Sequence, residues 1–254
     1  MQEYTKKSIE FIKAYFDSTA HGQFAVVGIS GGKDSACVAA LCVEALGSDK
    51  VLGVILPNKE MQDKEDAEKI CDLLKIHNIT VDISASYKHF TYEINRRLRG
   101  LGKEITEDGR INIAPRLRMT SLYAISSSIN GLVACTLNLS ERIVGYCTKW
   151  GDNVGDFAPI MHLTKEQVIL VGLDLGLPEQ IMKKAPNDGI SGHTDEENLG
   201  VTYDDIEKYI KGQGLDLKVM KKIESLIKRN AHKNKAIPSL LNFQVIENKN
   251  CKKE

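Results

Sequence analysis

The chain has 254 residues, in which 34 lysines and arginines balance 34 aspartates and glutamates. This length suits one α/β domain with a large core, whereas the neutral balance gives no overall positive field to attract nucleic acid. The first residues lack the apolar core of a signal peptide, and no apolar run is long enough to span a bilayer. We therefore expect a cytoplasmic protein that binds neither nucleic acid nor membranes.

The cysteines are scattered, with no C-x-x-C pair. Zinc ribbons, iron–sulfur clusters and disulfide frameworks are therefore disfavoured. Most of these thiols lie in apolar stretches, where a free cysteine behaves as a small hydrophobic side chain. The six are Cys37, Cys42, Cys71, Cys135, Cys147 and Cys251.

The first part of the chain alternates between helical and extended patterns. Because right-handed crossovers join parallel strands, this order predicts an α/β fold, a doubly wound parallel sheet with helices on both faces. Its ligand is expected at the carboxyl ends of the strands. The expected elements are a helix at 4–17, a strand at 24–29, a helix at 36–46, a strand at 51–57, a helix at 63–76 and a strand at 79–83.

The rest of the chain adds further helices and two polar connections to the same domain. We expect one domain over 1–254, with mobile loops near 100–110 and 184–200 that close over a ligand. The remaining elements are predicted as helices at 87–98 and 113–130, a strand at 132–136, a helix from Thr164 to 175, and helices at 203–211 and 217–230.

A Gly-rich stretch, Ser-Gly-Gly-Lys-Asp-Ser at 30–35, connects the first predicted strand to the helix that follows it. Such a turn gathers backbone N–H groups and the positive end of a helix around one point, which suits phosphate. It is not a Walker A sequence, because Asp34 stands where that motif requires Ser or Thr. The alternative is a strand-to-helix turn without a ligand, but two adjacent glycines, an acid and two serines exceed what a bare turn needs.

This loop resembles the pyrophosphate loop (PP-loop) of the ATP-pyrophosphatase superfamily, and residues 138–152 resemble the signature of NAD synthetases. Further matches to that family follow in order at Asp156, 163–165, 184–186, 199–204 and 232–233, and 116–119 match before it. The resemblance covers nearly the whole chain and implies an adenine nucleotide alpha hydrolase-like, Rossmann-like fold. The chain departs from the family pattern at Asn153-Val154, commonly Gly-Gly, and at Asn187, where Thr is usual.

The resemblance implies ATP-dependent amidation of deamido-NAD (nicotinate adenine dinucleotide) by ammonia, the last step of NAD biosynthesis. An adenylate would form first, and AMP and pyrophosphate would be released. Free ammonia is expected as the nitrogen donor, because the chain has no room for a glutamine-hydrolysing domain. The implied catalytic residues are Asp34, Glu141, Asp152 and Lys165, with Asp34 and Glu141 as the ligands of Mg²⁺.

The same resemblance implies the substrate contacts. Thr136 would contact adenosine, Tyr146 would stack on the pyridine ring, and Asp152 and Asp156 would lie near the nicotinate and the incoming ammonia. The implied ATP-binding residues are Ser30, Gly31, Gly32, Lys33, Asp34, Ser35, Arg116, Thr136, Lys165 and Asn187. Those for deamido-NAD are Arg116, Tyr146, Lys149, Asp152, Asp156, His232 and Lys233.

Two alternatives remain open at this point. The first is another ATP-pyrophosphatase that amidates or thiolates a different acceptor. This group includes tRNA modifiers, but the neutral charge and the absence of paired cysteines in the sequence disfavour a tRNA substrate. The second is a catalytically silent nucleotide sensor, which would not need two separated metal carboxylates. A homodimer is implied by the resemblance and favoured by the apolar content of 117–129, which exceeds what one sheet face needs.

Overall fold

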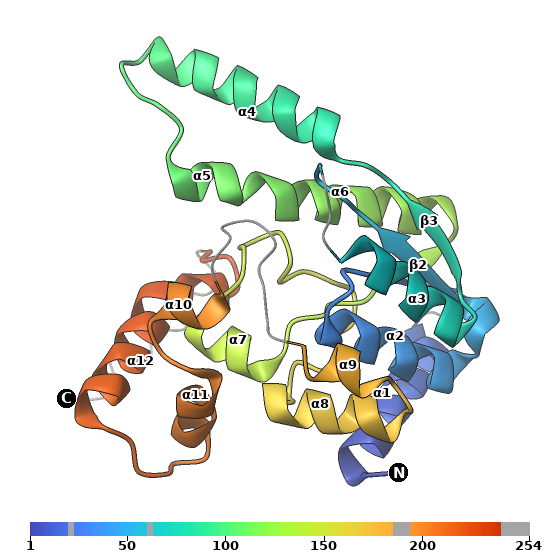
Figure 1. Ribbon diagram of the computed structural model, residues 1–254. Helices are drawn as coiled ribbons and strands as arrows, with labels where there is room; N and C mark the ends of the chain where they lie inside the picture. The colour runs from blue at the N-terminus through green and yellow to red at the C-terminus, as the bar shows by residue number, and fades with distance from the viewer. Residues whose placement is uncertain (20–22, 60–62, 185–193, 240–254) are drawn as a thin grey trace.

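The computed structural model describes residues 1–19, 23–59, 63–184 and 194–239 (Figure 1). Its centre is a parallel sheet with the strand order β3-β2-β1-β4. The strands are β1 (Phe24–Gly28), β2 (Val51–Ile55), β3 (His77–Thr80) and β4 (Gly131–Val133). This order confirms the predicted doubly wound α/β fold, in which the chain reverses direction across the sheet next to β1.

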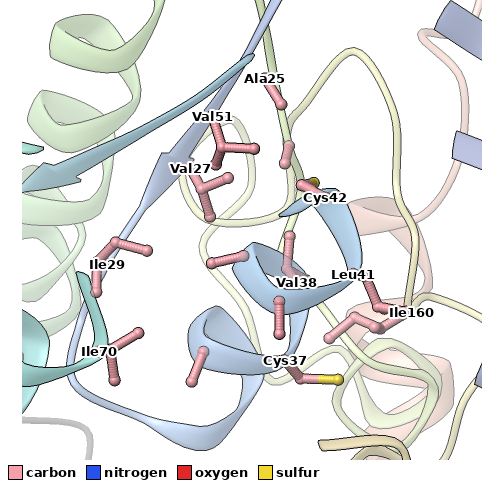
Figure 2. Packing of buried hydrophobic residues seen from close by; sticks show 14 of the residues in the cluster. Ala25, Val27, Ile29, Cys37, Val38, Leu41, Cys42, Val51, Ile70 and Ile160 are labelled. Carbon is pink, nitrogen blue, oxygen red and sulfur yellow. The ribbon is translucent and has the colours of Figure 1, made fainter. Parts of the chain in front are cut away.

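One face of the sheet is covered by helices that pack on alternate side chains of β1. Ala25 and Val27 point into a core shared with α2, whose Val38 and Leu41 are fully buried (Figure 2). Val26, between them, faces the opposite side. This alternation is the period-two pattern of a strand buried on both faces. The helices that contribute to the first core are α1 (Glu3–Thr19), α2 (Lys33–Leu46), α3 (Lys64–Leu74), α8 (Lys165–Asp174) and α9 (Glu179–Met182).

The opposite face is covered mainly by α6 (Ile113–Ser128), which packs on β1 and β4. The helix α4 (Ser84–Arg99) contacts α6 but extends beyond the sheet, and each of its residues is at least partly exposed (Figure 1). The short helix α5 (Glu107–Ile111) follows and leads into α6.

A separate group of helices packs beside the sheet around its own core. We call α10 (Asp195–Leu199), α11 (Tyr203–Ile210) and α12 (Leu217–Asn230) the helical cap, and it packs on α7 (Leu139–Val144) (Figure 1). One 3₁₀ turn, Ala231–Lys233, directly follows α12, and another, Ser48–Lys50, precedes β2. The core between the cap and α7 consists of Val144, Leu199, Val201, Tyr203, Ile206, Ile223 and Leu226.

Several predicted boundaries are wrong, for physical reasons that the structure shows. The fourth strand ends at Val133 because Ala134 forms only a single bridge, to Phe157. The predicted connections near 100–110 and 184–200 contain α5 and α10, although 185–193 lie outside the described residues. The helix expected from Thr164 is confirmed, with Thr164 as its N-cap in a capping box with Gln167.

The described cysteines are free thiols, and four of the five are buried, as the apolar context predicts. Among the described helices, none combines the length and the low charge that a bilayer span requires.

Gly31 illustrates how tightly the loop before α2 packs. Its φ is +79°, and a Cβ at this position would lie 2.4 Å from the carbonyl oxygen of Asp63. We predict that Gly31→Ala lowers the free energy of unfolding by about 2 kcal/mol or more, because the left-handed backbone and the backbone clash both disfavour a side chain. Urea denaturation measures this loss.

Gly212→Ala is the matched control, since Gly212 has φ +65° and an added Cβ meets no described atom within 4 Å. In Gly212→Ala the free energy of unfolding should fall by only about 1 kcal/mol, because the left-handed backbone is disfavoured but no clash is added. Equal losses in the two variants would show that the packing against Asp63 contributes nothing.

Candidate active site

A cavity of about 900 Å³ opens at the carboxyl ends of the strands. Its walls come from the PP-loop, the start of α6, the segment that follows β4, α8 and the helical cap. Parallel strands with right-handed crossovers place their connecting loops at this edge, which is where ligands bind in such sheets. The fold therefore brings the two motifs found in the sequence, at 30–35 and 138–152, into one site.

The PP-loop is held in shape by its own hydroxyl groups. Ser35 Oγ donates to the carbonyl oxygen of Gly32 at 3.0 Å, and it accepts a hydrogen bond from the backbone N–H of Ser30 at 3.2 Å. The two serine hydroxyls are 3.1 Å apart. In the described chain no side chain caps the N-terminus of α2, which begins at Lys33. Its first N–H groups are therefore available to an anion.

Asn138 connects the two carboxylates that the sequence singled out. Its Nδ2 donates to Asp34 Oδ1 at 2.9 Å, and its Oδ1 accepts from the backbone N–H of Glu141 at 3.0 Å. The second bond caps the N-terminus of α7, the helix that carries Glu141. The fully buried amide of Asn138 therefore holds both Asp34 and the start of α7 in place.

Lys165 forms the centre of a buried ionic cluster. Its Nζ lies 2.9 Å from Glu141 Oε1 and 3.5 Å from Asp195 Oδ2, and the three side chains are only 7%, 16% and 8% exposed. Charged groups so far from water require partners, because removing an ion from water costs several kcal/mol. The cluster supplies these partners within the cavity wall.

The pKa values in this cluster follow from burial and from the neighbouring charges. Burial, together with the charge of Asp34, raises the pKa of Glu141 to about 7, although Lys165 opposes this shift. Burial lowers the pKa of Lys165, but the carboxylates of Glu141, Asp34 and Asp195 outweigh it and raise the pKa above the ordinary lysine value. Burial and the charge of Lys165 lower the pKa of Lys33. The wall therefore combines three carboxylates, of Asp34, Glu141 and Asp195, with the two ammonium groups of Lys33 and Lys165.

Asp34 and Glu141 suit a cation better than they suit each other. The raised pKa of Glu141 comes first from burial and second from the charge of Asp34, so a cation bound between the two carboxylates would favour the ionised form of Glu141. Within the described part of the chain, no group of three or more His, Cys, Asp or Glu side chains is arranged so that it could hold a metal ion. Mg²⁺ normally takes one or two carboxylates, with phosphate oxygens and water completing its octahedron.

A second polar corner of the cavity surrounds Asp152. Its Oδ1 accepts the backbone N–H of Thr148 at 2.6 Å, and Thr148 Oγ1 lies 2.6 Å from Asn112 Oδ1. The residue is exposed to the cavity, but desolvation by the surrounding wall raises the pKa of Asp152 to about 6, against the lowering effects of that N–H and of Lys233. Asp152 is thus a carboxylate that is exposed to the cavity and titrates closer to neutral pH than an ordinary aspartate.

The structure brings most of the predicted site residues together. Those that line the cavity are Ser30, Gly32, Lys33, Asp34, Ser35, Thr136, Glu141, Tyr146, Asp152, Lys165, His232 and Lys233. Asn187 lies outside the described residues.

Four predicted residues lie outside the cavity wall. Gly31 has a positive φ and forms the turn of the PP-loop behind the cavity wall. Asp156 accepts the backbone N–H of Val133 at 2.7 Å, which connects the end of β4 to the segment that follows it. Arg116 is exposed and donates to the carbonyl oxygen of Lys149, whose own Nζ lies over the Trp150 ring. Substrate contacts by Arg116, Lys149 and Asp156 stay predictions.

The ammonium group of Lys233 is already engaged. It donates to the carbonyl oxygens of Gly145 and Cys147, each at 2.8 Å, and the backbone of Lys233 accepts from Asn153 Nδ2 at 3.2 Å. Asn153 occupies a position that is commonly glycine in the family pattern, and only a side chain can make this contact. The departure noted in the sequence therefore alters the wall next to Asp152.

Sequence reasoning missed several residues of the site. Asn138 and Arg118 stand inside the motifs that we quoted, yet neither received a role; Arg118 lines the cavity and donates to the carbonyl oxygen of Leu56 at 3.1 Å. Asp195 was missed because it follows a stretch interpreted as a loop. The Thr194–Glu197 capping box was the signal that predicts a helix there.

The fold and the loop define a nucleotide-binding protein of the PP-loop class, in which a parallel sheet presents a Gly- and Ser-lined turn to phosphate. A family model described as NAD synthase matches residues 4–237. The chain belongs to the NAD synthase family.

Relatives and solved structures agree with this assignment. The NH(3)-dependent NAD(+) synthetase of Pyrococcus horikoshii is 40% identical over 83% of this chain and 85% of its own length. The structure of NMN synthetase from Francisella tularensis superposes with a TM-score of 0.83 at 33% identity, covering 93% of this chain and 97% of that one. The NH3-dependent NAD synthetase of Campylobacter jejuni gives a TM-score of 0.74 at 30% identity, covering 94% and 98%.

Proposed function

We propose that this chain catalyses the ATP-dependent amidation of deamido-NAD by ammonia, forming NAD, AMP and pyrophosphate. The observation that carries the proposal is that one cavity joins the PP-loop, the cluster of Asp34, Glu141 and Lys165, and the carboxylate of Asp152, which is exposed to the cavity. Family membership and relatives named NH(3)-dependent NAD(+) synthetases support the same activity.

In the first half-reaction, a nicotinate carboxylate oxygen attacks the α-phosphorus of ATP. A new O–P bond forms, and the bond from that phosphorus to the pyrophosphate oxygen breaks. The backbone N–H groups at the start of α2 and the hydroxyl of Ser30 would hold the departing pyrophosphate, and Ser35 would join them by turning its hydroxyl away from the Gly32 carbonyl oxygen. Lys165 would neutralise charge that develops on the phosphate oxygens.

Mg²⁺ is part of the proposal, with Asp34 and Glu141 as its protein ligands. The feature that fits a cation is that both carboxylates line the same cavity beside the PP-loop and are joined through Asn138. When bound, the ion would supply positive charge to the phosphate oxygens. Asn138 holds Asp34 and the first turn of α7 in register for this role.

In the second half-reaction, the nitrogen of ammonia attacks the carbonyl carbon of the adenylate, and AMP leaves with the bridging oxygen. Ammonium is the dominant solution species at neutral pH, yet only neutral ammonia carries a free lone pair. The carboxylate of Asp152 would bind the cation and accept its proton. Its pKa of about 6 leaves it ionised at neutral pH, as this role requires.

Nicotinate mononucleotide is a second candidate acceptor. The structure of an NMN synthetase superposes with a TM-score of 0.83, and it shares this fold over 97% of its chain. In addition, Lys233, which was expected to bind the dinucleotide, has its ammonium committed to two carbonyl oxygens. The ratio of kcat/KM for the two acceptors decides between them, and we expect deamido-NAD to be preferred.

Incubation with ATP, Mg²⁺, ammonium and deamido-NAD, following NAD and AMP together, tests the activity itself. The proposal predicts one AMP for each NAD. AMP without NAD would favour an ATP-pyrophosphatase with a different acceptor, and no turnover would favour a nucleotide sensor.

We predict that Asp34→Asn and Glu141→Gln each reduce adenylation and NAD formation together. Each substitution is nearly isosteric and removes one anionic oxygen ligand. The lost charge stabilisation would raise the activation free energy of adenylation by several kcal/mol. Pyrophosphate exchange into ATP reports adenylation alone. Glu107→Gln, on α5, is an exposed control that should keep the wild-type rate; wild-type rates in the two site variants would contradict the metal assignment.

We predict that Asp152→Asn raises the ammonium concentration needed for half-maximal rate, while pyrophosphate exchange persists. The amide can no longer accept the proton of ammonium, but the adenylation site is intact. In wild type, the rate at a fixed total ammonium concentration should rise with pH as the neutral fraction grows. An unchanged ammonium dependence in the variant would remove Asp152 from the second half-reaction.

A homodimer is also part of the proposal, with α4 as a contact. The apolar residues of 117–129 pack in part against the sheet, whereas α4 leaves Phe90 50% exposed beside a shallow groove shared with Ile94 and Leu98. A second copy of the chain would cover this face. We predict that the wild type sediments as a dimer at micromolar concentration and that Phe90→Glu dissociates it.

Leu217→Glu, at an equally exposed apolar position on α12, should leave the dimer intact. A wild-type monomer, or equal behaviour of the two variants, would contradict α4 as the interface.

A further inference from the structure

We infer that Asp195 and Tyr203 of the helical cap are positioning residues for Lys165, holding its ammonium group at the phosphate side of the cavity. The inference rests on the proposed function, because it assigns a task to a lysine that the function uses. It adds two residues that touch the lysine rather than the substrate.

The contacts around the Lys165 Nζ come from three directions. Glu141 Oε1 lies at 2.9 Å, Asp195 Oδ2 lies at 3.5 Å, and the centroid of the Tyr203 ring lies at 3.8 Å. A carboxylate on each side and an aromatic face fix the place of a flexible side chain that is only 7% exposed. Two of the three ammonium N–H groups are directed to carboxylates, which leaves one for a ligand oxygen.

Tyr203 acts on Lys165 in a second way, through Asp195. Its hydroxyl donates to Asp195 Oδ2 at 2.9 Å, the same oxygen that faces the lysine. Both side chains are buried. The hydrogen bond orients the carboxylate, so the aspartate does not depend on the lysine alone for its rotamer.

The backbone of the cap makes this pair rigid. Asp195 is the first residue of α10, behind the capping box of Thr194 and Glu197, and Glu196 Oε1 accepts the backbone N–H of Tyr203 at 2.8 Å. The ring of Tyr203 also belongs to the core between the cap and α7. The position of Lys165, at the start of α8, is therefore coupled to the packing of the helical cap, which begins later in the chain at Asp195.

The reason for a second anchor lies in the task of Glu141. If Glu141 directs an oxygen to a cation, Lys165 loses part of its hold on that carboxylate. Asp195 has no such second task among the contacts of the described residues: its carboxylate meets only Lys165 and Tyr203. It would keep the ammonium in place throughout the reaction, where a displacement of about 1 Å costs on the order of 100-fold in rate.

The test uses Asp195→Asn and Tyr203→Phe in the full chain, with Asp204→Asn and Tyr209→Phe on the same helix α11 as controls. Asp204 is exposed and pairs with Lys208, and Tyr209 packs at the edge of the cap core, so neither touches the cavity. We expect kcat for NAD formation and the rate of pyrophosphate exchange to fall about 100-fold in Asp195→Asn and about 10-fold in Tyr203→Phe. The KM for ammonium should stay within about twofold, because Asp152 is untouched, and the controls should match wild type.

The double variant gives a sharper result. If Tyr203 acts through the carboxylate of Asp195, Asp195→Asn/Tyr203→Phe should be no slower than Asp195→Asn alone. Multiplicative losses would show that the two side chains act independently, and wild-type rates in both single variants would overturn the inference.

A spectroscopic measurement separates this inference from the proposed function. In protein labelled with ¹⁵N-lysine, the ammonium signal of Lys165, assigned by its loss in Lys165→Met, should be visible in wild type and in the two controls. It should shift or broaden in Asp195→Asn and Tyr203→Phe even if the wild type proves inactive with deamido-NAD. An unchanged signal in both variants, with thermal melts confirming that they are folded, would refute the positioning role whatever the activity.

Discussion

The charge on Lys165 is the feature on which the site depends. A buried ammonium group requires compensation, and the chain provides it from two separate elements, with Glu141 on α7 and Asp195 on α10. Asp34 and Lys33 complete the cluster from the start of α2. Removing one member leaves another buried charge without a partner, so these groups have to be considered together.

The fold explains how such distant residues meet. The parallel order of β4, β1 and β2 sends the PP-loop and the segment after β4 to the same edge of the sheet. Asn138 then joins them with two hydrogen bonds, and the helical cap closes the third side by packing on α7. The sheet core provides a rigid base, while the chemistry lies in connections between elements, as in other doubly wound folds.

The sequence was sufficient for the fold class and for most of the cavity wall. The apolar run before 30–35 and the handedness of the crossovers predicted a site at the carboxyl ends of the strands, whereas Glu141 and Lys165 were assigned to it only through the resemblance to NAD synthetases. The sequence was insufficient where a role depends on partners distant in the chain. Nothing local to Arg116 or Lys149 shows that they contact each other outside the cavity, and nothing local to Asp195 shows that Tyr203 turns its carboxylate toward Lys165.

The central claim is that the carboxylate of the acceptor attacks the α-phosphorus of ATP in this cavity. Deamido-NAD labelled with ¹⁸O in both carboxylate oxygens tests it most directly, by mass spectrometry of the products formed with ATP and ammonium. The account predicts that one labelled oxygen appears in each AMP and the other stays in the amide of NAD, with none in pyrophosphate. Unlabelled AMP, or label in pyrophosphate, would contradict it.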